Sequence, residues 1–241
     1  MLHKTEAVVL HTVSYNDTYA IVHVLTEAFG PVSYLTAKTK GKKTRVPKSL
    51  FHPMSIVELE VEHRNLREIQ RLKEARTTVP LLSILNNPVK STICIFLAEL
   101  IGKVATDIQP NQRMFDFIRQ SIRILEVMET NYANFHLVFM IDLSRFLGFY
   151  PDSSGYSSGM YFDLMNGVFV SFKPAHSHFL TPDESRTFFN LLRMNYENMA
   201  LFAFSRHERK DIIARILEYY RIHLTRLPEI KSLEILHEVF G

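Results

Sequence analysis

The feature that most constrains the fold is a change in sequence pattern at Pro80. Before Pro80, short apolar and β-branched runs alternate with turn-forming residues, a pattern typical of strands. Residues 66–76 fit either a helix or a strand that pairs back across the preceding turn, and both alternatives stay open. The other runs predict strands at residues 5–13, 19–26, 32–37 and 54–62. Five short strands in about 80 residues predict a small closed barrel.

After Pro80, apolar residues recur at helical spacing, which predicts a mostly helical second part. Ser91 is the expected N-cap of the first long helix, and Gly148 is expected to end the third. Capping boxes that begin at Thr181 and Ser205 predict the starts of two more helices. Helices are expected at residues 91–107, 111–129 and 132–147, after Thr181, and from Ser205 to about Leu224, with a last short helix at 231–240.

An irregular stretch at about residues 149–180 interrupts these helices. It opens with a loop rich in serine and glycine, and Asn166-Gly167 then lies between two apolar runs. Asn-Gly is a strong signal for a two-residue turn, so a small β-hairpin is expected here. The predicted class is therefore α+β. A barrel is expected at residues 1–79 and a helical domain at residues 80–241, with the hairpin inserted in the helical domain at about 149–180.

Positive charge is concentrated in one short segment of the predicted barrel. Residues 1–80 carry 12 Lys and Arg against 8 Asp and Glu, whereas the rest of the chain carries 16 against 17. A segment of this kind either binds a polyanion such as nucleic acid or forms a solvated loop. Its cations, uninterrupted by any acid, are Lys38, Lys40, Lys42, Lys43, Arg45 and Lys48.

Three tyrosines near this segment are candidate stacking platforms for bases. Single-stranded nucleic acid is commonly bound by a positive groove combined with aromatic side chains, because every base has a π-face. Tyr15, Tyr19 and Tyr34 lie in or beside the predicted strands. The alternative is that they pack in the barrel with their hydroxyls at its rim.

Signals for an enzyme, a metal site or a membrane segment are weak, and neither a cofactor nor a metal is expected. The chain lacks the G-x-S-x-G, Gly-rich phosphate-loop and H-E-x-x-H motifs. The single cysteine, Cys94, lies in an apolar helix and is expected in the core. His176 and His178 lack converging ligands, and Glu58 and Glu60 are expected on an exposed strand face. The most apolar stretch is too short to span a bilayer, so a cytoplasmic protein is expected.

Several motifs, in order along most of the chain, resemble the RecO family of bacterial recombination mediators. The opening residues 5–35 are similar to that family's beginning, including Asp17-Thr18 and Thr26-Glu27. The basic segment, with Pro47-Lys48-Ser49, falls where the family has its own basic loop. Further similarities are Leu147-Gly148-Phe149-Tyr150-Pro151, residues 217–224 and residues 233–240.

The resemblance implies an oligonucleotide-binding (OB) barrel followed by a helical domain. It also implies binding of single- and double-stranded DNA, annealing of complementary strands, and cooperation with RecR in loading the recombinase RecA. A further implied partner is the C-terminal tail of single-stranded DNA-binding protein. Leu137 and Val138 stand where tail-binding arginines are expected, so the candidate partner-binding residues are Arg123, Arg145 and Lys173.

Many family members hold zinc with four cysteines in the inserted element. Residues 152–180 contain no cysteine, so zinc is expected to be absent and the Asn166-Gly167 hairpin to replace it. Three functions are therefore distinguished: a non-enzymatic DNA mediator associated with the nucleoid, a scaffold whose helical domain binds a partner peptide without touching DNA, and, with least support, a nuclease.

Overall fold

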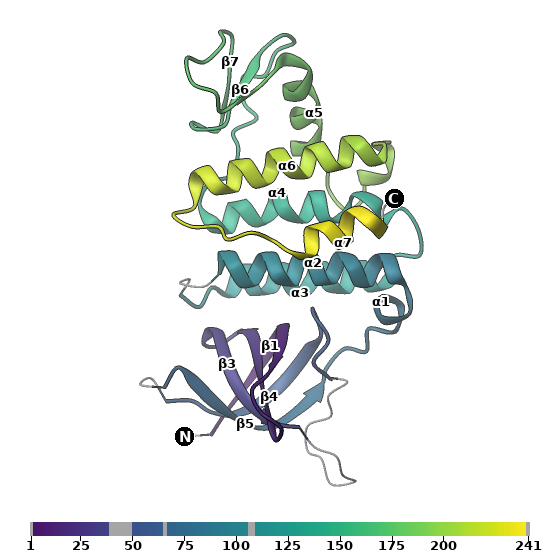
Figure 1. Ribbon diagram of the computed structural model, residues 1–241. Coiled ribbons are helices and arrows are strands. Elements are labelled where there is room, and N and C mark those ends of the chain that lie inside the picture. Colours follow the sequence, from purple (N-terminus) through teal and green to yellow (C-terminus); the bar gives the residue numbers. More distant parts are fainter. Residues whose placement is uncertain (1, 39–49, 65–66, 106–108, 240–241) are drawn as a thin grey trace. The chain divides into compact units, whose positions relative to one another are not determined.

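A computed structural model describes residues 2–38, 50–64, 67–105 and 109–239 (Figure 1). The chain divides into two compact units. The first comprises Met1–Val127 and Glu229–Val239, and the second Met128–Pro228 with Phe240–Gly241. None of the helices in the described ranges is long and apolar enough to cross a membrane.

The first unit contains a closed five-stranded barrel, which confirms the predicted architecture. Its order is β1-β2-β3-β5-β4, and every pair is antiparallel except β3 with β5. The last strand settles the alternative left open at residues 66–76, because this segment pairs with both β4 and β3. The strands are β1 (Leu2–Ser14), β2 (Tyr19–Thr26), β3 (Gly30–Ala37), β4 (Ile56–Glu62) and β5 (Ile69–Thr77).

Alternating side chains fill the barrel. In β4, Val57, Leu59 and Val61 are at most 1% exposed and join a core with Val22 and Val24 of β2. The intervening glutamates are only half-buried on the outer face. Register shifts in β1, after Val9, and in β4, after Glu60, mark irregularities of the kind that bends strands enough to close a barrel.

The described residues of the first unit also form four α-helices. They are α1 (Leu82–Asn86), α2 (Pro88–Val104), α3 (Gln112–Val127) and α7 (Ser232–Val239). The predicted N-cap of α2 was wrong. The side chain of Asn87 caps this helix by accepting from the N–H groups of Val89 and Lys90, with Pro88 in the first turn, so α2 begins before Ser91. α2 packs on β1 and also on α7, which lies beside it in Figure 1.

The second unit combines helices with a small sheet. Its helices are α4 (Phe135–Leu147), α5 (Pro182–Leu192) and α6 (Arg206–His223). Gly148 ends α4 in the left-handed region with φ of 86°, and both predicted capping boxes, at Thr181 and Ser205, are present. Short 3₁₀ turns cover Tyr132–Asn134 and Met199–Leu201.

The inserted hairpin is present but differs from the prediction in two respects. β6 (Tyr161–Asp163) and β7 (Val168–Val170) are joined by four residues instead of two, and β8 (Phe179–Leu180) adds a third strand. The longer turn forms because the carboxylate of Asp163 accepts from the N–H groups of Met165 and Asn166 and from the Asn166 side chain. Gly167 supplies the left-handed residue, with φ of 69°.

Candidate nucleic-acid interface

Two exposed tyrosines flank the turn between β1 and β2. Tyr15 and Tyr19 are 60% and 40% exposed. The side chain of Asn16 fixes this turn by accepting from the N–H groups of Thr18 and Tyr19, at 2.9 and 2.8 Å. The N–H of Tyr15 also donates to the carbonyl of Tyr19 at 3.0 Å. The turn therefore holds two aromatic rings at the same end of the barrel.

Lys38 ties the end of β3 to this turn. Its backbone N–H donates to Thr18 O at 2.7 Å, and its ammonium donates to Asn16 O at 2.5 Å and to the hydroxyl of Ser14. Pairing of Tyr19 with Ala37 places the start of the basic segment beside the tyrosines. Lys38 thus has a visible structural role in addition to its charge. The other predicted contacts, Lys40, Lys42, Lys43, Arg45 and Lys48, lie outside the described residues.

The chain on the far side of the basic segment returns to the same end of the barrel. Phe51, two residues after the segment that the structure leaves undescribed, packs against the barrel core and, with Lys38, lines a hollow of about 280 Å³. Thr36, Ala37 and Ala20 also line this hollow. Residues on either side of the basic segment therefore meet beside the exposed tyrosines.

Tyr34 does not belong to this surface. It is 0% exposed inside the barrel, where burial raises the pKa of its hydroxyl above the ordinary value. This hydroxyl has no hydrogen-bond partner among the residues that the structure describes. Its ring packs in the core and cannot stack on a base in this conformation, so Tyr34 is not part of the candidate interface.

Sequence reasoning missed a pair of histidines on the outer face of the barrel. His11 of β1 and His23 of β2 are paired across the strands and stack with their ring centroids 4.1 Å apart. The pair lies on the same face as Ser33, whose hydroxyl is 2.8 Å from Nδ1 of His23. Strict alternation along β2, which places Val22 and Val24 inside, was the signal that could have found His23.

Another face of the barrel carries balanced charge. Arg76 pairs with Glu58 at 2.6 Å, and Lys73 pairs with Glu62 at 3.0 Å. Glu60 lies between these pairs, on the outer side of β4. Cations already paired with carboxylates leave little net charge for a phosphate. This face is therefore a weaker candidate for DNA than the tyrosine-bearing end.

The three candidate partner-binding residues are divided between the two units. Arg123 is exposed on α3 of the first unit. Arg145 belongs to the second unit, where it pairs with Asp142 at 3.3 Å and lies 3.5 Å from the centre of the Tyr150 ring. Lys173, in the inserted element, lies 5.5 Å from the ring of Phe179.

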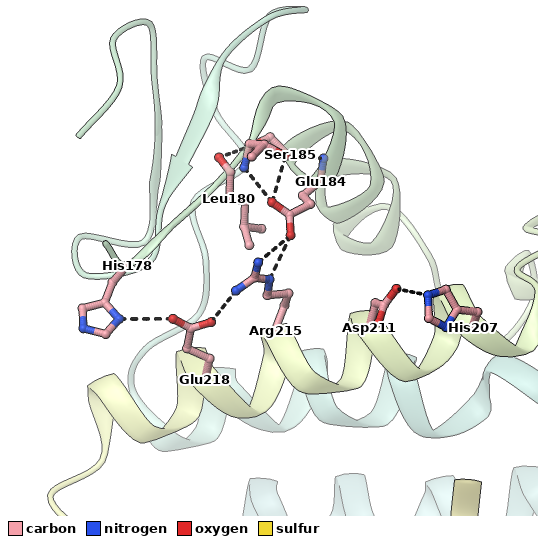
Figure 2. A network of polar contacts seen from close by, with 9 residues as sticks. His178, Leu180, Glu184, Ser185, His207, Asp211, Arg215 and Glu218 are labelled. Carbon is pink, nitrogen blue, oxygen red and sulfur yellow. Dashed lines mark hydrogen bonds and ion pairs between the residues drawn. The ribbon is translucent and has the colours of Figure 1, made fainter. Parts of the chain in front are cut away.

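A polar network joins α5, α6 and the small sheet of the second unit (Figure 2). Arg215 donates to Glu184 at 2.8 and 2.9 Å and to Glu218 at 2.8 Å, and Glu218 also pairs with His178 at 3.1 Å. A pocket of about 230 Å³ opens beside it, and its walls carry four carboxylates and two arginines. The carboxylates are Asp183, Glu184, Glu208 and Asp211. Such a wall repels an acidic ligand.

The residues present do not fit a zinc site of the four-cysteine kind. Cys94 is the chain's one cysteine, and it is 2% exposed within α2. His176 lies 3.3 Å from Asp163, but no group of three potential ligands occurs in the described ranges. The small sheet is instead fixed by the hydrogen bonds of Asp163 and by close packing at Gly167.

The fold and this surface define a protein with an OB-type barrel that presents two exposed tyrosines, with Lys38 beside them, at one end. The family model described as "Recombination protein O N terminal" matches residues 1–80, and "Recombination protein O C terminal" matches residues 85–234. The chain belongs to the RecO family of DNA repair proteins.

Curated relatives align with the whole chain. The DNA repair protein RecO of Azobacteroides pseudotrichonymphae is 61% identical over 240 residues, with 100% of both chains covered. That of Bacteroides fragilis is 43% identical over 241 residues, again with 100% of both covered. That of Flavobacterium psychrophilum is 31% identical over 239 residues, with 99% of both covered.

Proposed function

We propose that this protein binds DNA with the tyrosine-bearing end of its barrel, anneals complementary single strands, and helps load a recombinase onto single-stranded DNA coated by its binding protein. The observation that carries the proposal is the meeting of Tyr15, Tyr19 and both flanks of the basic segment at one end of the barrel. Residues 1–79 would be the DNA-binding domain. The action is non-enzymatic and takes place at the bacterial nucleoid, in the cytoplasm.

The mechanism rests on charge neutralisation and stacking. Two single strands repel each other through their phosphates, and a protein that neutralises phosphates releases counterions and lowers this barrier. Stacking on Tyr15 and Tyr19 orders bases without reading their sequence. If the basic segment and its surroundings make four to six phosphate contacts, the log–log salt slope on single strands is about −3 to −4.

The test is annealing of two complementary labelled oligonucleotides at two salt concentrations. We expect salt-sensitive acceleration by the wild type and loss of most of it in the quadruple variant K40A/K42A/K43A/R45A. The matched control removes four exposed cations elsewhere, in K73A/R76A/R186A/K210A, and keeps the acceleration. Acceleration that survives in the first variant moves the site elsewhere on the barrel. No acceleration by the wild type favours the scaffold, in which the helical domain binds a peptide and DNA is not touched.

The tyrosines are tested separately from the charges. Stacking of one base on an aromatic side chain contributes about 1–3 kcal/mol by alanine substitution. Tyr15→Ala and Tyr19→Ala are therefore expected to weaken binding of a dT30 oligonucleotide by about fivefold or more each, while Tyr15→Phe and Tyr19→Phe bind as the wild type does. Equal affinity of the alanine and phenylalanine variants contradicts the stacking role.

RecR and the C-terminal tail of single-stranded DNA-binding protein are the proposed protein partners, on the strength of family membership. Residues 80–241 would be the partner-binding domain. Arg123, Arg145 and Lys173 remain the candidate contacts for the tail. Anisotropy of a labelled tail peptide tests them, with Arg145→Lys as the control for Arg145→Ala because lysine keeps the charge near Asp142 and Tyr150. Unchanged affinity in all three alanine variants contradicts the assignment.

A further inference from the structure

The described residues between β4 and β5 are arranged around one buried amide. Gln70, the second residue of β5, is 2% exposed. Its Oε1 accepts from the N–H of Arg64 at 2.9 Å, and its Nε2 donates to the carbonyls of Arg64 and Arg67 at 2.8 and 2.7 Å. The N–H of Arg67 donates to Arg64 O at 3.0 Å. A buried amide left unpaired is costly, so Gln70 and the backbone of both arginines hold each other in place.

The same connection is anchored on its other side by aromatic packing. The ring of His63, which precedes Arg64, stacks on Phe29 with centroids 4.0 Å apart and an interplanar angle of 6°. Phe29 packs against the barrel core. Arg64 therefore follows directly on a stacked ring and is itself bonded to a buried side chain, which makes its backbone well fixed for a residue in a connection.

The guanidinium groups of this connection are exposed and have no paired carboxylate. Neither Arg64 nor Arg67 has an ion pair or side-chain hydrogen bond within the ranges that the structure describes, and the same holds for Arg71. By contrast, Lys73 and Arg76, farther along β5, pair with Glu62 and Glu58. The hydrogen bond from Lys73 is the main cause that lowers the pKa of Glu62, with smaller effects from Arg64 and Arg71. Around the beginning of β5, three unpaired arginines, Arg64, Arg67 and Arg71, thus outnumber one exposed carboxylate, that of Glu68.

The register of the barrel relates these arginines to the tyrosine-bearing end. β5 runs parallel to β3, with Ile69 beside Ser33 and Arg71 beside Leu35. At about 3.3 Å per residue, Ser33 and Lys38 are roughly 16 Å apart along β3. Arg64 and Arg67 precede Ile69, so they lie toward the opposite end of β3 from Lys38. A nucleic-acid strand that follows the outer side of β3 from Lys38 reaches Arg71 first and Arg67 next.

We infer that Arg64 and Arg67 bind backbone phosphates of the same single strand that contacts the tyrosine-bearing end, and that Gln70 is the positioning residue that holds them. The inference rests on the proposed function, because it extends that DNA site by a second contact point. Guanidinium groups suit phosphate oxygens, which they can bind with two parallel N–H donors. Contacts of this kind carry no sequence preference.

The first test measures binding of a fluorescent dT30 oligonucleotide over a range of salt concentrations. Loss of two phosphate contacts in R64A/R67A is expected to reduce the magnitude of the log–log salt slope by about 1.4, with weaker binding at low salt. The matched control is K73A/R76A, which removes two paired cations from the same strand and leaves the slope unchanged. An unchanged slope and affinity in R64A/R67A overturns the inference while leaving the proposed function intact. Salt-insensitive binding, or none, by the wild type overturns the proposed function itself.

The second test separates positioning from general stability. Gln70→Leu is combined with R64A/R67A in a double-mutant cycle for dT30 affinity. If Gln70 acts through the arginines, Gln70→Leu weakens binding in the wild-type background and has no further effect once both arginines are gone. Equal losses in both backgrounds contradict a positioning role. If Gln70→Leu fails to fold, Arg64→Lys and Arg67→Lys replace it, with a loss of affinity supporting the guanidinium contact and wild-type binding opposing it.

Discussion

The carboxylate of Glu99, in α2, caps the N-terminus of α7 by accepting hydrogen bonds from the backbone N–H and the hydroxyl of Ser232, at 2.8 and 2.6 Å. The N–H of Lys231 donates to the same carboxylate at 3.0 Å, and Lys103 forms an ion pair with it at 2.8 Å. A side chain from a distant helix thus satisfies N–H groups that α7 leaves free at its own start. This contact holds α7 within the unit that contains the barrel.

The first prediction is that Glu99→Gln lowers stability at pH 7 and weakens the protein's sensitivity to acid. Burial opposes ionisation of Glu99, but the hydrogen bonds from Lys103, Ser232 and Lys231 outweigh it and lower the pKa to about 2. A carboxylate with a lowered pKa stabilises the fold at pH values above the pKa that it has in the unfolded chain, which is about 4.3 for glutamate. This contribution is lost as the pH falls from about 4.3 toward 2. For a shift of this size the loss is at most about 3 kcal/mol.

Urea denaturation between pH 6 and pH 2.5 measures this effect. The difference in unfolding free energy between wild type and Glu99→Gln is expected to shrink as the pH falls below about 4.3. Glu129→Gln, which removes an exposed carboxylate at the start of the second unit, serves as the control and should parallel the wild type. Parallel curves for Glu99→Gln would contradict the assigned role.

A second prediction concerns Cys94. Burial raises the pKa of this thiol to about 12, and its side chain is 2% exposed within α2. The thiolate is the reactive form, so the native protein is expected to resist a thiol reagent at pH 8 while the urea-unfolded protein reacts fully. Because the chain has one cysteine, labelling reports directly on opening of α2. Rapid labelling of the native protein at the unfolded rate would contradict this burial.

Local patterns predicted the strands and the long helices well. The predictions that failed or stayed open depended on contacts between residues that are distant in sequence. The alternative at residues 66–76 was decided by pairing with β4 and β3, which are distant in sequence. α1 went unpredicted because its five residues carry no cap of their own. The carboxylate of Glu126, on α3, accepts from the N–H groups of Ser83 and Ile84 in its place.

The candidate site, too, could be predicted only in part from the sequence. Tyr15 and Tyr19 follow from their places beside a turn, whereas Tyr34 alternates inward with Val32 and was recognisable as a core residue from that alternation. A buried glutamine such as Gln70 reads as a surface residue in the sequence, because its partners are backbone groups that only the folded connection supplies. The boundary between residues 79 and 80 and the basic segment's contacts with DNA stay predictions.

A third prediction is that His11 and His23 make the barrel less stable in mild acid. Burial lowers the pKa of both imidazoles, with Glu99 opposing the shift at His11 and His11 adding to it at His23. An imidazole with a lowered pKa stays neutral in the folded protein at pH values where the imidazole of the unfolded chain already binds a proton. The pKa of that unfolded imidazole is about 6.5. The contribution of these two histidines to the free energy of unfolding is therefore fully present above pH 6.5 and is lost as the pH falls below it.

NMR titration of the imidazole protons is the direct measurement, with both midpoints expected below 6.5. In urea denaturation, the wild type should lose more stability between pH 7.5 and 5.5 than the double variant H11Q/H23Q, which cannot titrate at these positions. Midpoints at or above 6.5, or equal losses in both proteins, would count against the stacked neutral pair.

The last prediction concerns how the small sheet is held against α6. A Cβ added to Gly167 would lie 2.6 Å from the hydroxyl oxygen of Tyr219, and the residue has a left-handed φ of +69°. Tyr219 cannot yield easily, because it is 2% exposed and its hydroxyl donates to the carbonyl of Phe149 at 2.8 Å. Gly167→Ala is therefore expected to destabilise the protein by about 2 kcal/mol or more, since the backbone strain alone costs about 1–2 kcal/mol.

Two further variants separate the clash from the strain. Gly155 has a similar φ of +77° with nothing within 4 Å of an added Cβ, so Gly155→Ala should show the strain alone. Tyr219→Phe removes the atom that the new Cβ meets, and in that background Gly167→Ala should cost less than in the wild type. Thermal and urea unfolding of the four variants measure these differences. If Gly167→Ala and Gly155→Ala cost the same, and Tyr219→Phe gives no rescue, then close packing at Gly167 is not what fixes the sheet, and the hydrogen bonds of Asp163 must carry that role.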